Sequence, residues 1–109
     1  MNLPAEYHDL VEGYLESLAE TGLLLAELVE ELCVEPDKAL PELRALAHKL
    51  AGNGASFGFP EISEAAKEVT LAARGFSQAR NTGSQRVVDR ARELQRVCEN
   101  ARSRWERSR

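Results

Sequence analysis

The sequence has 109 residues, the size of one domain, and we expect residues 1–109 to form a single unit. Hydrophobic residues make up 43% of the chain and charged residues 29%, a composition that excludes an intrinsically disordered protein. The net charge of −4 is unevenly spread: residues 1–36 hold nine acids and no Lys or Arg, whereas residues 81–109 hold eight arginines against four acids. We interpret this as an acidic first helix packed beside a basic last helix, so nucleic-acid binding gains little support.

The apolar runs are all shorter than the roughly 18 residues that a membrane span requires. The first ten residues, MNLPAEYHDL, lack the basic and then apolar order of a secretory signal peptide. Cys33 and Cys98 form no CxxC pair, and we expect both to be small buried core residues in a reducing compartment. We therefore expect a cytoplasmic protein with no membrane contact.

Apolar residues recur every three to four positions, which predicts helices, and no segment alternates as a strand does. The first helix is predicted from about Pro4 to Val34. Gly13 and Gly22 each weaken it by roughly 1 kcal/mol relative to Ala, so a break at either is compatible with the pattern. The run Leu23–Leu25 exceeds one stripe, and partial burial is favoured over a docking or dimer surface. The expected core stripe is Leu10, Tyr14, Leu18, Thr21, Leu25, Leu28 and Leu32.

A second helix is predicted after Glu35-Pro36, with Asp37 as its N-cap and Pro41 in its opening turns. The turn Gly58-Phe59-Pro60 separates it from a third helix. The expected core stripe of the second helix is Leu43, Ala47, Leu50, Gly54 and Phe57.

The third helix is predicted to bury Ile62, Ala66, Val69 and Ala73. Gly75 is its predicted C-terminal cap, and a polar loop over residues 76–83 leads to Ser84, the predicted N-cap of the last helix. The stripe of that helix is Val87, Ala91, Leu94, Cys98, Ala101 and Trp105, with Trp105 closing one end of the core. Four such stripes with short connections predict an all-α, antiparallel, up-down-up-down four-helix bundle.

His48 lies on the wrong side of the second helix for a core residue. At 100° per residue, the core stripe clusters within roughly 40° of one direction, and His48 points about 140° away from it. A solvated helix face normally carries long polar side chains. Here the neighbours are small, Ala45, Ala51, Gly52 and Ala55, with Arg44, Lys49 and Asn53 at the edges.

A bare face around one imidazole fits the close approach of a partner. Neutral imidazole is a good nucleophile, bulky neighbours would block in-line attack, and nearby cations would screen a phosphoryl group. The alternative is a surface histidine beside glycines that are needed for tight helix packing. The geometry alone supports both interpretations equally.

The segment AHKLAGNGASFGFPEISEAAKEV, residues 47–69, resembles the histidine phosphotransfer (HPt) domain family of bacterial phosphorelays. The family motif has an Ala-His pair, a Leu two residues after the histidine, a Gly at the fourth position, and a later Gly that closes the helix. Those places hold Ala47, His48, Leu50, Gly52 and Gly58.

The resemblance implies that His48 accepts a phosphoryl group from a response-regulator receiver domain and passes it to another receiver. It implies a hybrid sensor histidine kinase as a further partner, and no kinase activity or ATP site in this chain. No cofactor is expected, because the receiver supplies its own aspartate and Mg²⁺. The residues expected to support docking or phosphate binding are Arg44, Lys49, Ala51, Gly52, Ala55 and Thr70, the last near a place where some members carry a polar partner for the imidazole.

The chain departs from the family at Ala51, where many members carry Lys or Arg. This leaves two alternatives: an HPt-like adaptor that binds receivers without turning phosphate over, and a structural bundle in which His48 has no chemical role. A second phosphoacceptor at His8 is disfavoured by its bulky and charged neighbours. No metal site is expected, because the two histidines are forty positions apart without ligands in suitable spacing. We expect a monomer.

Overall fold

The protein is almost entirely helical in the computed structural model, which describes residues 5–78 and 84–108. This part of the chain contains four α-helices and one short 3₁₀ helix, η1. The elements are α1 (Ala5–Val34), α2 (Pro36–Asn53), η1 (Ala55–Phe57), α3 (Pro60–Gln78) and α4 (Ser84–Ser108). The predicted all-α four-helix fold is therefore confirmed.

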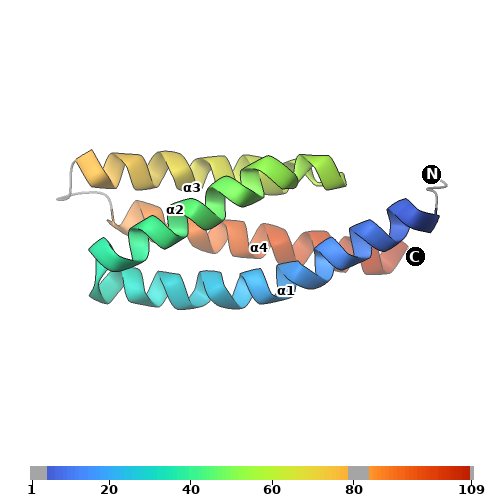
Figure 1. Cartoon of the computed structure of the whole chain (residues 1–109). Helices are drawn as coiled ribbons and strands as arrows, with labels where there is room; N and C mark the ends of the chain where they lie inside the picture. Colours follow the sequence, from blue (N-terminus) through green and yellow to red (C-terminus); the bar gives the residue numbers. More distant parts are fainter. Residues whose placement is uncertain (1–4, 79–83, 109) are drawn as a thin grey trace.

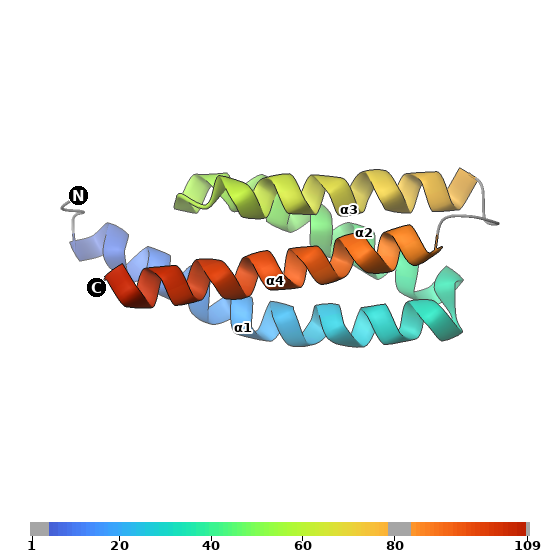
Figure 2. The same ribbon diagram turned by 180° about the vertical axis from the view of Figure 1, so that it is seen from behind.

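The helices pack as an elongated antiparallel bundle about 50 Å long and 19 by 18 Å across. Each helix packs on the helices before and after it, and α4 closes the bundle by packing on α1. Figure 1 shows α2 crossing obliquely from the end of α1 to the start of α3, and Figure 2 shows α4 on the opposite side, between α3 and α1. The acidic first helix and the basic last helix are thus neighbours, as their charges predicted.

The core follows the predicted stripes most closely in the second half of the chain. Ile62, Ala66, Val69 and Ala73 of α3 are all fully buried. In α4 the predicted stripe is buried from Val87 to Ala101, and Trp105 is partly buried against the core. These positions fall every three to four residues because that spacing returns a side chain to the same face of a helix.

The first helix differs from its prediction in three respects. Leu10 is 61% exposed and Val11 takes its place in the core, while Thr21 is only partly buried. The helix does not break at its glycines. The apolar run is split, because Leu25 is buried while Leu23 is 70% exposed and Leu24 is also exposed. Successive residues point 100° apart, so adjacent leucines cannot all face one core.

Cys33 is exposed, contrary to the prediction that both cysteines are buried, whereas Cys98 is buried as predicted. Cys33 follows Leu32, which fills the core, and so lies about 100° off the buried stripe.

Three predicted helix ends are also wrong. α2 ends at Asn53 rather than at the Gly58 turn, residues 55–57 form η1, and Phe57 of the predicted stripe is only partly buried. α2 begins at Pro36 with Glu35 as its N-cap, so Asp37 lies in the first turn, where its carboxylate suits the helix dipole. α3 continues through Gly75 to Gln78 because Phe76, predicted to start a loop, is buried in the core. The remaining predictions at Pro4 and over residues 79–83 lie outside the described residues.

Within the described ranges, no helix is both long enough and apolar enough to cross a membrane.

Candidate functional site

His48 is an exposed residue near the middle of the bundle's length. The hydroxyl of Tyr14 in α1 donates a hydrogen bond of 2.9 Å to Oδ1 of Asn53, which places these two residues at one level. His48 precedes Asn53 by five residues in the antiparallel helix, so it lies level with about the fifth residue after Tyr14. That point is close to the midpoint of α1.

The contacts at the end of α2 show which neighbour His48 adjoins. Asn53 contacts α1, whereas the backbone N–H of Ala55 donates to Oγ of Ser63 in α3 at 2.9 Å. His48 precedes Asn53 by five residues and therefore lies about 140° from it around α2, on the flank away from α1 and toward α3. Lys49 precedes Asn53 by one turn and shares the flank that faces α1.

A close contact between α2 and α3 holds this flank in place. Gly54 is buried, and a Cβ added to it would lie 3.0 Å from Cβ of Ile62 and 3.0 Å from both N and Oγ of Ser63. Only a residue without a side chain allows α3 to approach this closely.

The turn after Gly54 redirects the chain into α3. The N–H of Phe59 donates to the carbonyl of Gly54 at 2.9 Å, and Gly58 has φ +92°, a left-handed conformation that favours glycine. Tyr14 stacks on Phe57 with ring centroids 4.3 Å apart and covers the turn from the α1 side. The end of the His48 helix is thus anchored on both flanks.

The surface around His48 is bare, as the sequence predicted. Ala45, Gly52 and Ala55 are exposed, and Ala51 is partly buried. A Cβ added at Gly52 would have no atom within 4 Å, so helix packing does not require this glycine. Helix packing therefore explains Gly54 but does not explain Gly52.

The polar residues predicted at the site separate into two groups. Arg44 lies one turn before His48 on the flank that faces α3, whereas Lys49 lies on the other flank. Among the described residues, no hydrogen bond or ion pair holds the side chains of Arg44, His48 or Lys49. The hydroxyl of Thr70 in α3 donates to the carbonyl of Ala66 at 3.2 Å, which leaves its oxygen lone pairs as acceptors.

Lys67, which was not among the predicted site residues, precedes Thr70 by three residues and shares its flank of α3. The spacing of Lys67 and Thr70 in the sequence already indicates that they are neighbours, because residues three apart are adjacent on a helix surface. Its relevance depends on the packing of α3 against α2, which the sequence does not show.

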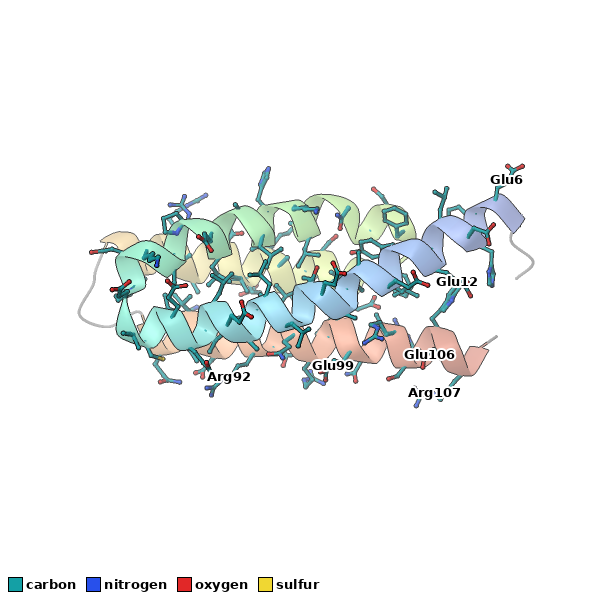
Figure 3. All side chains as sticks on the ribbon, turned by 60° about the horizontal axis from the view of Figure 1, so that its bottom comes forward. Glu6, Glu12, Arg92, Glu99, Glu106 and Arg107 are labelled. Atoms are coloured by element: carbon teal, nitrogen blue, oxygen red, sulfur yellow. The ribbon has the colours of Figure 1, made fainter. Side chains whose placement is uncertain are left out.

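The other chemistry-bearing groups lie away from this face. His8 packs against Trp105 of α4, with ring centroids 4.9 Å apart, and its Nδ1 is 3.8 Å from a carboxylate oxygen of Glu12. Figure 3 shows Arg92 and Arg107 projecting from α4 away from the rest of the bundle. Within the described part of the chain, no three His, Cys, Asp or Glu residues are grouped to hold a metal ion.

The chain belongs to the Hpt domain family, whose sequence pattern matches residues 9–104. The match runs from the first turns of α1 almost to the end of α4 and includes His48. Members of this family are phosphocarrier modules of phosphorelays rather than kinases, and receiver domains are their general partners. No curated protein and no solved structure matches the chain.

Proposed function

We propose that this protein relays a phosphoryl group between receiver-domain aspartates through His48. The observation that carries the proposal is the exposed imidazole of His48 in a face of small residues. No other described residue holds this imidazole by a hydrogen bond or an ion pair. A hybrid sensor histidine kinase is the proposed source of phosphate, and the cytoplasm is the proposed location.

The transfer is an in-line displacement at phosphorus. An imidazole nitrogen of His48 attacks the aspartyl phosphate, the N–P bond forms, and the P–O bond to the receiver carboxylate breaks. The other imidazole nitrogen keeps its hydrogen. The second receiver reverses these steps, and its carboxylate takes the phosphoryl group. The receiver supplies Mg²⁺, so this chain contributes the nucleophile and the docking surface.

Each residue around His48 has a proposed role. Gly52, Ala51 and Ala55 leave room for the receiver to approach. Arg44 adds positive charge on the same flank, and the hydroxyl oxygen of Thr70 orients the imidazole by accepting a hydrogen bond from its N–H. Lys49, on the flank toward α1, contacts the receiver rather than the phosphoryl group.

The test is phosphorus NMR after incubation with a phosphorylated receiver and Mg²⁺. We expect an acid-labile, alkali-stable phosphoramidate signal in the wild type and in His8→Gln, and none in His48→Gln, whose fold is checked by circular dichroism. A signal that persists in His48→Gln would contradict the proposal.

The adaptor alternative is favoured by one observation, the neutral Ala51 at a position where many family members carry a cation. It predicts receiver binding without any phosphoramidate signal, so the same NMR samples distinguish the two functions when receiver binding is measured in parallel.

A further inference from the structure

Lys67 lies on the flank of α3 that faces α2. Ser63, which accepts the hydrogen bond from Ala55 of α2, marks this flank. Lys67 follows Ser63 by four residues and therefore shares its side of the helix. The opposite flank of α3 faces α4, where Glu61 forms an ion pair with Arg104. Lys67 and His48 thus border the same groove between α2 and α3.

The two residues also lie at similar heights along the bundle. Residues before Gly54 in α2 and residues after Ser63 in α3 extend in the same direction along the bundle from the contact between Gly54 and Ser63. His48 precedes Gly54 by six residues and Lys67 follows Ser63 by four, which correspond to about 9 Å and about 6 Å of helix at 1.5 Å per residue. The offset along the bundle of about 3 Å is less than the length of a lysine side chain, so the difference in height does not keep the ammonium group from a phosphoryl group on His48.

The side chain of Lys67 is free to turn toward His48. Its side chain is 61% exposed, and its ammonium nitrogen is 4.0 Å from the nearest carboxylate oxygen of Glu64, a long and weak ion pair. Exposed pairs of this kind on one helix contribute little and are screened by salt. A phosphoryl group with about two negative charges is a stronger partner for the ammonium group than one solvated carboxylate.

We propose that Lys67, together with Arg44, is a phosphate-binding cation of this site and performs from α3 the role that Ala51 cannot perform from α2. The inference rests on the proposed function of His48. Lys67 keeps its protons throughout and stabilises the charge on the phosphoryl oxygens as the N–P bond forms. Lys49 does not fulfil this role, because it lies on the other flank of α2.

The experiment compares Lys67→Gln with Lys38→Gln. Lys38 is a matched control, since it is 68% exposed and pairs with one glutamate, Glu31, at 3.4 Å near the α1–α2 turn. Phosphohistidine formation is followed by phosphorus NMR in two arms, one with a phosphorylated receiver and one with phosphoramidate, a small donor that needs no docking. A unit charge and a doubly charged group about 7 Å apart in water predict roughly a sevenfold slower reaction in Lys67→Gln.

The expected result is slowing in both arms at low salt, a smaller effect in about 0.5 M salt, wild-type rates in Lys38→Gln, and recovery when Ala51→Lys is added to Lys67→Gln. Slowing in the receiver arm alone would identify Lys67 as a docking contact and overturn the inference. Wild-type rates in both arms would overturn it as well.

The two arms separate this inference from the proposed function. If the wild type reacts with phosphoramidate but not with any receiver, the relay function fails, while the phosphoramidate rates still decide the role of Lys67. An unreactive His48 in both arms would overturn both.

Discussion

Gly52 and Gly54 are two residues apart at the end of α2, and a methyl group added to each is expected to have opposite effects. Gly54 has φ −55° and ψ −52°, an ordinary right-handed helical conformation that alanine also adopts. The cost of Gly54→Ala therefore comes from contacts alone. The new Cβ would lie 3.0 Å from the backbone N of Ser63, which cannot move without shifting the start of α3.

The magnitude follows from two opposing terms. Overpacking a well-packed site costs about 1–3 kcal/mol. Replacing a helical glycine by alanine returns up to about 1 kcal/mol. We expect a net loss of about 1–2 kcal/mol in the free energy of unfolding for Gly54→Ala, or a Tm lower by about 4–10 °C for a domain of this size. Gly52→Ala meets nothing within 4 Å and should gain up to about 1 kcal/mol.

The assay is urea and thermal unfolding followed by circular dichroism at 222 nm, with the two variants and the wild type measured side by side. The midpoints should fall in the order Gly54→Ala, wild type, Gly52→Ala. A Gly54→Ala variant as stable as the wild type would refute the reasoning, because it would show that α3 can move away from α2 without cost.

Three further predictions concern the surface and the core. Gly52→Gln, which adds bulk beside His48, should weaken receiver binding in a titration while leaving helix content unchanged or higher, and unaltered affinity would show that the bare face is not the docking surface. In a thiol assay near pH 8, exposed Cys33 should react promptly and Cys98 slowly, because burial raises the pKa of the Cys98 thiol to about 11. Cys33→Ser should remove the fast phase, and two fast thiols in the wild type would contradict the buried position of Cys98. Burial raises the pKa of Tyr14 above the ordinary tyrosine value near 10, so stability should be complete below about pH 10 and decline above it. Tyr14→Phe, which loses the hydrogen bond to Asn53, should be about 1 kcal/mol less stable at pH 7 and decline less in alkali, as pH-dependent urea unfolding would reveal.

Individual helices could be predicted from the sequence wherever apolar spacing was strict. The stripe from Ile62 to Ala73 was correct at every position, because the angle between residues depends only on local backbone geometry. The outward direction of His48 was predicted for the same reason. Gly75 shows where local reasoning failed: a glycine predicts a helix end, but the burial of Phe76 in the core favours one more turn.

The sequence by itself determined the helical stripes, the bare face around His48 and its family motif. Only the tertiary structure decided which flank of α2 faces α3, since a bundle of either hand would satisfy the same stripes. That choice places Lys49 on the flank of α2 toward α1 and Lys67 on the flank of α3 toward α2. Both lysines look alike in the sequence, and the packing of α3 against Gly54 distinguishes them, because charge acts through distance in space rather than along the chain.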